Sequence, residues 1–378
     1  MKKLTIVVSL WASVALAELQ PESPGIIESL PDTWPAHWII AADASFFHMS
    51  DGKFIVLDAD SDDPNDRFKG FFNGSLIANF AQATSRPEMY IAETFRSRGQ
   101  RGERTDVLTI ISKSSLEPIG EVVIPPKRSS NMPTAYNVSL VDDEKLALVY
   151  NFTPAQSVTV VDVVEREFLA EIPTPGCALA YPMPGRAFAS ICADASIMAV
   201  TIGDDGRQQS STRTAPFFDV AADPLMEKPV IYGGIAYFPT FLGNVYPVDL
   251  NGSTPVVGEP WSMVGDEQGG WRPGGILFGA ADSAGNLYFL MHPEGSDGTH
   301  KDPGVEVWVF DRDSGRRSKR IELALPALSI NVTRDEEPLL VATNVNMEID
   351  VYDAASGQHQ RTLGNFGQET PLTLWVAQ

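Results

Sequence analysis

The segment from His292 to Asp302 contains side chains that could bind a metal ion. It carries two histidines, His292 and His300, together with Glu294, Asp297 and Asp302. Imidazole and carboxylate groups are ligands that divalent transition metals accept. The whole chain has only five histidines, however, and these side chains lack the tight spacing of metal-binding motifs. The sequence therefore favours a solvated or partner-facing loop here, and we predict no metal ligand on this chain.

The sequence also lacks the short motifs that identify common catalytic sites. It has no serine nucleophile elbow, phosphate-binding loop, dinucleotide fingerprint or His-Glu-x-x-His run. Aspartate is abundant, but most copies stand at the ends of apolar runs, where turn formation explains them. We therefore predict neither a catalytic residue nor a cofactor-binding residue on this chain.

The first residues predict that the chain is exported. Lys2 and Lys3 form a basic start, residues 4–14 are mostly apolar, and Ala15-Leu16-Ala17 fits a cleavage site. The apolar run is too short to span a bilayer. We expect residues 1–17 to be a signal peptide cleaved after Ala17. Residues 18–36, which are rich in Pro, Glu and Ser, are expected to form an N-terminal arm.

The two cysteines, Cys177 and Cys192, are predicted to form a disulfide. An even number of cysteines in an exported chain is usually paired. A two-residue turn at Pro184-Gly185 would place the flanking residues opposite one another in a hairpin, so that Cys177 faces Cys192 directly.

The charge of the chain restricts its partners. The formal net charge is −21, which repels phosphate backbones and argues against nucleic-acid binding. No segment after residue 17 has the length and apolarity to cross a membrane. An acidic surface suits a basic protein partner, and it equally suits a soluble exported protein.

One repeated phrase predicts the elements that must position these residues. It is clearest at residues 305–315, where polar and apolar residues alternate before an Asp and a Gly end the run. Alternation at period two indicates a strand, and Asp with Gly supplies the turn that ends it. Six further copies occur, at 54–58, 107–112, 158–162, 198–203, 245–252 and 349–357.

The spacing of these copies predicts the fold class. Seven units recur every 49 residues on average, about the period of a β-propeller blade of four strands. We therefore predict an all-β protein in which residues 37–378 form a seven-bladed β-propeller. The lone strand 371–376 is expected to close the ring by pairing with the strand that begins at residue 37.

In such a propeller the longest connections are expected on one face of the disc. They span 43–52, 94–106, 261–274 and 292–304, while the turns of the opposite face are mostly tight. Long loops in a compact domain are usually functional, so this face is the expected docking or active face. Phe46-Phe47-His48 lies in the first of these loops, and either ring could pack into the blade instead of facing a partner.

Residues 101–106, Arg-Gly-Glu-Arg-Thr-Asp, with the strand 107–112 that follows, resemble the heavy subunit of the tryptophan tryptophylquinone amine dehydrogenases. Other segments agree in order along nearly the whole mature chain, including the paired cysteines. They are Pro125-Pro126-Lys127-Arg128, Trp261-Ser262, Trp271-Arg272-Pro273-Gly274-Gly275, Met291-His292-Pro293, Gly298-Thr299-His300-Lys301 and Ser329-Ile330-Asn331-Val332.

The resemblance implies a periplasmic heterotetramer of two heavy and two light subunits. In that family the light subunit carries the tryptophan tryptophylquinone, oxidises a primary amine to an aldehyde and ammonia, and passes electrons to a small blue-copper protein. The heavy subunit holds the light subunit and helps to form the substrate channel. Phe46 matches the channel phenylalanine by position, and the adjacent Phe47 is the alternative.

Two questions stay open at the level of sequence. Some segments resemble the aromatic-amine branch of the family, whereas Gly270-Trp271-Arg272-Pro273 is closer to the methylamine branch. A stand-alone propeller enzyme or propeller binding protein is the alternative function. Copurification of a small cysteine-rich subunit would discriminate between the two.

Overall fold

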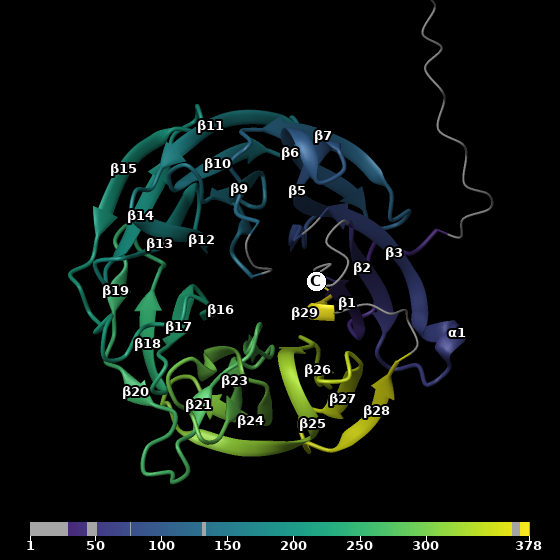
Figure 1. Cartoon of the computed structure of the whole chain (residues 1–378), viewed down its shortest axis with the longest axis vertical. Coiled ribbons are helices and arrows are strands. Elements are labelled where there is room, and N and C mark those ends of the chain that lie inside the picture. Colours follow the sequence, from purple (N-terminus) through teal and green to yellow (C-terminus); the bar gives the residue numbers. More distant parts are fainter. Residues whose placement is uncertain (1–28, 44–50, 76, 131–133, 365–370, 378) are drawn as a thin grey trace, which may run out of the picture.

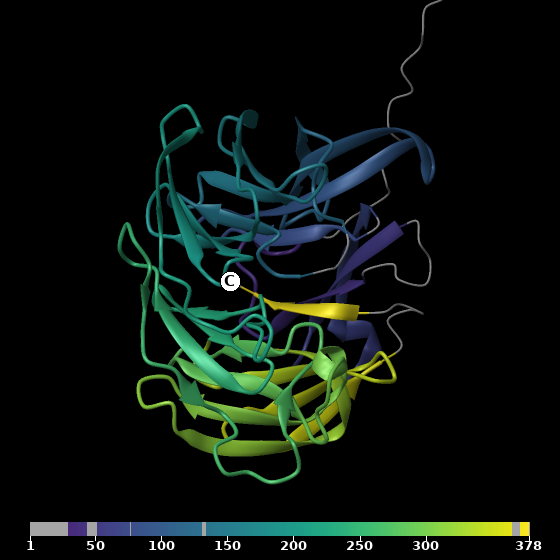
Figure 2. The same ribbon diagram turned by 60° about the vertical axis from the view of Figure 1, so that its left-hand side comes forward.

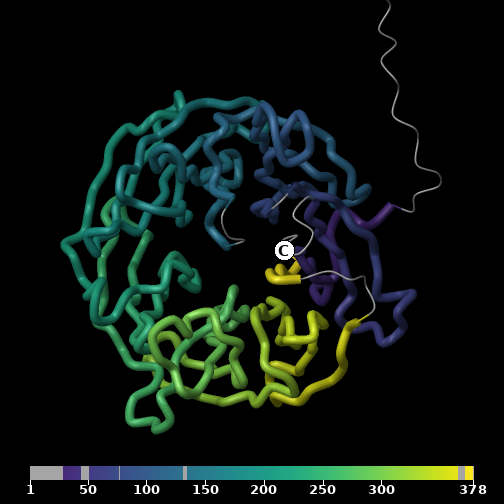
Figure 3. The backbone as a smooth tube through the Cα atoms, in the orientation of Figure 1, coloured from purple at the N-terminus to yellow at the C-terminus, as the bar shows by residue number. Residues whose placement is uncertain are grey.

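The computed structural model describes residues 29–43, 51–75, 77–130, 134–364 and 371–377. Antiparallel sheets are arranged in a ring around a central axis, as Figure 1 and the backbone trace in Figure 3 show. The expected signal peptide and the residues Phe46 and Phe47 lie outside the described part of the chain.

Among the described residues, five separate sheets are blades of four or five strands. The first consists of β29 (Pro371–Val376), β1 (Trp38–Asp43), β2 (Asp51–Asp58) and β3 (Phe68–Ser75), and the second of β4 (Asn79–Gln82), β5 (Glu88–Arg98), β6 (Arg101–Ser112) and β7 (Pro118–Ile124). The third consists of β8 (Val138–Val141), β9 (Leu146–Asn151), β10 (Ser157–Asp162) and β11 (Glu167–Pro173). The fourth consists of β12 (Cys177–Met183), β13 (Ala187–Cys192), β14 (Ile197–Ile202) and β15 (Gln208–Arg213). The fifth consists of β16 (Val230–Tyr232), β17 (Ile235–Pro239), β18 (Asn244–Asp249), β19 (Val256–Val257) and β20 (Trp261–Ser262).

The remaining strands of the described chain form one sheet of eight. They are β21 (Arg272–Pro273), β22 (Gly279–Ala281), β23 (Asn286–His292), β24 (Gly304–Asp311), β25 (Arg317–Val332), β26 (Leu339–Asn344), β27 (Ile349–Asp353) and β28 (His359–Leu363). Two short helices complete the description, α1 (Pro64–Arg67) and the 3-10 helix η1 (Thr299–Lys301).

The all-β propeller is confirmed, but the prediction of seven separate blades is wrong. The structure has five separate blades, and the strands expected to form two more belong to the single eight-stranded sheet. The cause is β25, which pairs with β24 along its first half and with β26 along its second. Residues 322–328 between the two halves contain no Gly, Asn or Asp, and their single Pro326 does not end the strand, so the chain stays extended.

The C-terminal strand closes the ring as predicted. β29 pairs antiparallel with β1, with Ile39 opposite Val376 and Ala41 opposite Leu374. The last residue of β29 also contacts the second blade: the Gln82 Nε2 atom donates to the carbonyl of Val376 at 2.6 Å. The first blade therefore contains strands from both ends of the chain.

The two faces of the disc differ as expected, with one correction. We call the side that carries the β1–β2, β5–β6, β17–β18 and β23–β24 connections the long-loop face. Residues 94–106 are not a loop on that face: β5 and β6 continue as a hairpin as far as the pair Arg98 and Arg101 (Figure 2). The excursion 292–304 contains η1, and 261–274 contains only β20 and β21.

Candidate functional site

An open pocket of about 810 Å³ lies between the first two blades on the long-loop face. Asp51 and Lys53 of β2 line one side, and Glu93, Phe95 of β5 and Arg104 of β6 line the other. The segment that contains Phe46 and Phe47 joins β1 to Asp51, the first residue of β2. The pocket therefore includes Asp51, the residue that follows in sequence the segment for which a role in a substrate channel is predicted.

The base of this pocket is built on a buried arginine. Arg128 is 1% exposed, and its guanidinium donates through Nε to Thr94 Oγ1 at 2.8 Å and through Nη1 to the carbonyl of Ile77 at 2.9 Å. Its backbone N–H donates to Asp106 Oδ2 at 3.0 Å. Burial lowers the pKa of Arg128 to about 10, against the opposing pull of Asp106. The side chain serves as an anchor between the two blades.

Asp106 connects this arginine to a second one. Its fully buried carboxylate accepts two hydrogen bonds from Arg104, one from Nε at 2.8 Å and one from Nη2 at 2.7 Å. Thr94 donates its hydroxyl to Asp106 Oδ1 at 2.8 Å while it accepts from Arg128. Such bidentate, charge-assisted bonds are the strong ones, and a fully satisfied network fixes the geometry of its members.

Glu93 occupies the opposite end of the same network. Its buried carboxylate accepts the backbone N–H of Ser75 at 2.9 Å and a short hydrogen bond from the hydroxyl of Thr109. Burial raises the pKa of Glu93, although these two bonds and the charge of Arg128 favour the ionised form. Glu93 therefore holds β3 against β5 and β6 below the pocket.

This network brings together two segments that the sequence marks as distinctive, 101–106 and 125–128. Sequence reasoning did not identify Glu93, Thr94 or their contact with Arg128. The sequence does contain a signal for these residues, since the Glu-Thr pair continues an otherwise apolar strand. Polar side chains buried in such a strand need hydrogen-bond partners, which indicates a buried polar network. The arrangement supports and orients the pocket, and it places the predicted motif residues at one site.

A second pocket of about 590 Å³ lies between the fifth blade and the eight-stranded sheet. Lys228, Leu242, Asp297, His300 and Lys301 are among the residues that line it. It belongs to the same face, because the β17–β18 turn and the excursion 292–304 both contribute to it.

The two histidines considered as metal ligands lie in different surroundings. The ring of His292 is buried, and its Nδ1 atom lies 3.0 Å from the carbonyl oxygen of Pro293. His300 belongs to η1 and lines the second pocket. Within the described ranges, no three His, Cys, Asp or Glu side chains form a group that could hold a metal ion.

The tryptophan segment at 271–275 is held by a stack of rings and arginines. Trp271 lies 5.1 Å from Trp308, measured between ring centroids, and the Arg320 guanidinium lies 5.0 Å from the Trp271 ring. Glu306 accepts from Arg320 Nε at 2.6 Å and from the Trp308 indole N–H at 2.6 Å. Cation–π contacts of this kind stabilise the position of the excursion 261–274 against β24 and β25.

The long-loop face also exposes several large apolar side chains. Phe95 is 48% exposed on the β5–β6 hairpin. Phe152, Val220, Leu242 and Val345 are exposed on other connections of this face. On the opposite face Val164 is the one large apolar side chain of this exposed class among the described residues, and the other exposed ones lie on outer strands. Apolar groups gathered on one face with polar neighbours are typical of a protein-binding surface.

The predicted disulfide is present, although the hairpin around it differs from the expectation. Cys177 of β12 is bonded to Cys192 of β13, and the two residues are direct partners across the ladder. Met183 pairs with Ala187, so the turn has three residues instead of two. A register shift between Ala178 and Tyr181 compensates for the extra residue and restores the pairing of the cysteines.

Comparison with known proteins adds evidence that is independent of this geometry. Residues 35–376 match the family model described as methylamine dehydrogenase heavy chain. The methylamine dehydrogenase heavy chain of Methylophilus methylotrophus is 26% identical over 366 residues, 96% of this chain and 88% of that one. The heavy chain of Methylorubrum extorquens is 25% identical over 364 residues, 94% and 86% of the two chains. The solved structure of Kuenenia stuttgartiensis hydrazine synthase superposes with a TM-score of 0.53 at 14% identity, covering 80% of this chain and 90% of that chain, and at this level shows a common fold alone.

Within the described residues, no helix has the length and apolar character that a membrane crossing requires.

Proposed function

Because the chain belongs to the methylamine dehydrogenase heavy chain family, we propose that it is the heavy subunit of a quinoprotein amine dehydrogenase that oxidises primary amines to an aldehyde and ammonia. The family match from residue 35 to residue 376 carries this proposal. The tryptophan tryptophylquinone resides on a separate light subunit and supplies the electron sink that ordinary side chains lack. This chain contributes the surface that holds the light subunit and the entrance for the amine.

The light subunit docks on the long-loop face in this proposal. The exposed apolar side chains of that face, Phe95, Phe152 and Leu242 among them, support the choice, because desolvated aromatic and aliphatic anchors dominate protein interfaces. The opposite face offers Val164 on the tight turn between β10 and β11. The partner surface is expected to be apolar at its centre and basic at its rim, because the net charge of this chain is −21.

The assignment of Phe46 or Phe47 to the substrate channel belongs to the same proposal. The support is positional: the segment that contains both rings ends at Asp51, which lines the pocket between the first two blades. The buried network of Arg128, Asp106 and Glu93 holds the base of that pocket in a fixed geometry. A bulky ring at the entrance then selects amines by size while the reaction takes place on the light subunit.

The family resemblance extends the proposal to assembly and location. We assign residues 1–17 to a cleaved signal peptide, residues 18–36 to an N-terminal arm and residues 37–378 to the propeller. The mature protein is then a periplasmic heterotetramer of two heavy and two light subunits. A small blue-copper protein accepts its electrons.

Purification from the native host tests the proposal. The tagged chain is expected to bring down a small cysteine-rich subunit with the absorbance of a protein-derived quinone. The complex is expected to reduce an artificial electron acceptor in the presence of a primary amine, and a panel of methylamine and aromatic amines identifies the substrate. A chain that purifies alone and turns over an amine by itself would favour the stand-alone propeller enzyme.

A matched pair of variants tests the docking face. Phe152→Ser on the long-loop face is expected to weaken light-subunit binding about tenfold, as the loss of an interface anchor does. Val164→Ser on the opposite face removes a similarly exposed apolar group and is expected to leave binding unchanged. Equal effects of the two variants would show that the long-loop face is not the interface.

A further inference from the structure

The first blade and the second half of the eight-stranded sheet meet where the ring closes, and Figure 1 shows β29 and β1 next to β26 there. We call this contact the closing seam. Its core is apolar, because Ile39 and Leu57 of the first blade belong to one buried cluster with Val341 and Val351 of the larger sheet. Polar side chains join the same two sheets outside this core.

His37 links the two sheets through both nitrogens of its imidazole ring. It directly precedes β1, and its Nδ1 atom lies 2.5 Å from Asp60 Oδ2, on the connection between β2 and α1. Its Nε2 atom lies 2.8 Å from Asp335 Oδ2 and 3.1 Å from the carbonyl oxygen of Glu337, both on the connection between β25 and β26. One nitrogen therefore faces the first blade, and the other faces the eight-stranded sheet.

These contacts require a protonated ring. An ionised carboxylate and a carbonyl only accept hydrogen bonds, so each ring nitrogen must donate to make its contact. The neutral imidazole has one N–H and one lone pair, and it satisfies one side while the lone pair faces an oxygen on the other. The protonated ring donates on both sides, and both bonds are then charge-assisted.

The charges around His37 favour the protonated form. Burial opposes protonation, but the carboxylates of Asp60 and Asp335 outweigh this effect and raise the pKa of His37 above its usual 6.5. Burial would raise the pKa of Asp335, whereas a hydrogen bond from Thr333 and the charge of His37 lower it. The side chain of His37 is 17% exposed, so salt screens these interactions only in part.

A second cation reaches the same carboxylates. Arg361 of β28 places Nε 2.8 Å from Asp62 Oδ1 and Nη1 3.9 Å from Asp60 Oδ1, so it also crosses the closing seam. Unlike histidine, arginine keeps its charge throughout the physiological range of pH. Further charged side chains of these elements are Asp58, which pairs with Lys69, Asp63, which caps α1, and the exposed Arg334, Glu336 and Glu337.

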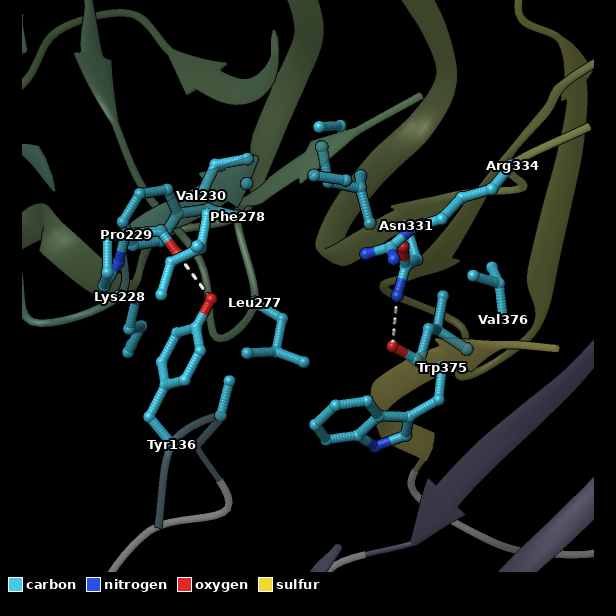
Figure 4. Close-up of a pocket in the computed structure, with 17 residues that line it drawn as sticks. Tyr136, Lys228, Pro229, Val230, Leu277, Phe278, Asn331, Arg334, Trp375 and Val376 are labelled. Atoms are coloured by element: carbon cyan, nitrogen blue, oxygen red, sulfur yellow. Dashed lines mark hydrogen bonds between the residues drawn. The ribbon is translucent and has the colours of Figure 1, made fainter. Parts of the chain in front are cut away.

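Two contacts on the inner side of the closing seam carry no charge. Beside a small cavity at the centre of the ring, the side-chain amide of Asn331 donates to the carbonyl of Leu374 of β29 at 2.8 Å (Figure 4). The hydroxyl of Thr343 donates to the carbonyl of Pro371 at 2.8 Å. Neither bond depends on a titrating proton, so deprotonation of His37 weakens one contact of the seam and leaves these two in place.

We propose that His37 is a proton-dependent latch across the closing seam: its imidazolium joins Asp60 of the first blade to Asp335 of the eight-stranded sheet, and loss of the proton releases one of the two bonds. The folded state binds this proton more tightly than the unfolded chain does. The stabilisation is therefore complete below pH 6.5, as long as Asp335 is ionised, and it is lost as the pH rises through the pKa of His37 in the folded protein. The latch is independent of the proposed amine dehydrogenase activity.

Nuclear magnetic resonance of the full chain with isotope-labelled histidine tests the protonation of His37. The chain has five histidines, and the signal that is missing from His37→Gln identifies this one. Its titration midpoint is expected to lie above pH 6.5 in the unaltered chain. It is expected to fall in Asp335→Asn, which keeps the shape of the side chain and removes its charge. A midpoint at or below pH 6.5 in the unaltered chain overturns the proposal.

Urea denaturation at constant ionic strength, between about pH 5 and about pH 9, tests the effect on stability. The unaltered chain is expected to unfold at a higher urea concentration than His37→Gln at the acidic end. This difference is expected to shrink as the pH rises, because glutamine, like the neutral ring, donates from one side only.

Two control variants separate the latch from other effects. Thr343→Val removes a neutral bond of the same seam and is expected to lower the unfolding midpoint equally at every pH. His300→Gln removes an exposed histidine of the long-loop face and is expected to keep the pH dependence of the unaltered chain. The proposal is also overturned if the midpoints of His37→Gln and the unaltered chain change with pH in parallel.

Discussion

The backbone N–H of Arg128 donates to the Asp106 carboxylate at 3.0 Å, and this bond joins two segments that are 22 residues apart in sequence. Asp106 ends the hairpin extension of β6, and Arg128 lies on the connection that leaves the second blade. The same carboxylate is held from its other side by Arg104. Asp106 therefore holds the two basic segments, 101–106 and 125–128, side by side in the fold.

Loss of the Arg128 side chain should destabilise the chain strongly. Arg128→Met removes the guanidinium charge that acts on Glu93 and the donors to Thr94 and to the carbonyl of Ile77, while Asp106 keeps its pair with Arg104. Breaking a buried charged network in this way costs about 3–5 kcal/mol of unfolding free energy. Urea denaturation measures the change. Lys127→Met is the control, because its partly exposed ion pair with Glu171 should contribute less than about 1 kcal/mol. Similar losses of unfolding free energy for the two variants would mean that the network around Arg128 stabilises the chain no more than a surface ion pair does.

Reduction of the disulfide should also lower stability. The bond closes a loop with a sequence separation of 15 residues, which corresponds to about 3 kcal/mol in the chain-entropy model. Denaturation of Cys177→Ala/Cys192→Ala beside the oxidised protein measures the loss. Peptide mapping without a reductant should recover the two halves linked, and free thiols in the purified protein would contradict the pairing.

The free energy of unfolding should depend on pH through the carboxyl group of Glu144. It accepts hydrogen bonds from Thr84 and Ser85 of the neighbouring blade. Burial would raise the pKa of Glu144, but the bonds from Ser85 and Thr84 outweigh this effect and lower it to about 2. Because the folded value lies below the usual 4.5, the stabilisation is complete above pH 4.5 and is lost as the pH falls towards 2.

Glu144→Gln should therefore lower the unfolding free energy at neutral pH by about 1–2 kcal/mol, after allowance for partial exposure. The difference from the unaltered chain should shrink as the pH is lowered below about 4.5. Glu165→Gln, a change at an exposed carboxylate of the same blade, is the control for altered net charge. A difference that stays constant down to acidic pH would show that the carboxylate charge is not what stabilises the contact.

Deletion of residues 370–378 should abolish cooperative unfolding and reduce solubility. Without β29 the edge of β1 is unpaired, and exposed strand edges promote aggregation. Calorimetry and light scattering measure both effects. Unchanged melting of the shortened chain would mean that the β29–β1 pairing does not hold the ring closed.

Phe46→Ala should change the amine preference of the assembled enzyme. A missing apolar contact in a binding site is worth roughly 1–3 kcal/mol of discrimination, so the ratio of kcat/KM values between small and large amines should shift accordingly. The quinone of the light subunit should still form. Phe47→Ala is the matched variant, and a shift in that variant alone would assign the channel position to Phe47. Loss of stability without a change in preference would assign Phe46 to blade packing.

Strand positions and ring closure could be predicted from the sequence because each blade repeats the same local chemistry. An apolar run that ends in Asp and Gly limits both the strand and its turn, as in 305–315. The separation of the blades could not be predicted, because β25 continues through Pro326 where the sequence has no Gly, Asn or Asp to mark a turn. The hairpin at 94–106 was mistaken for a loop since its charged residues are exposed on a projecting ribbon and carry no apolar alternation.

The network around Arg128 could not be predicted either. Its members come from β5, from β6 and from the connection that follows β7, and their spacing in sequence is irregular. The pairing of Cys177 with Cys192 was predicted although the turn was not, because the extra residue in the turn and the register shift beyond it compensate. The residues of a turn and the register of the strands are separate constraints. Here the predicted register at the cysteines is confirmed, and the predicted length of the turn is wrong.

The pairing of β29 with β1 also has a consequence for biosynthesis. A ribosome makes β1 among the first strands of the propeller and β29 last among them, so the ring cannot close until β29 has been made. Until then β1 pairs with β2 alone. The first blade is therefore the last to be completed, although most of its strands are made first.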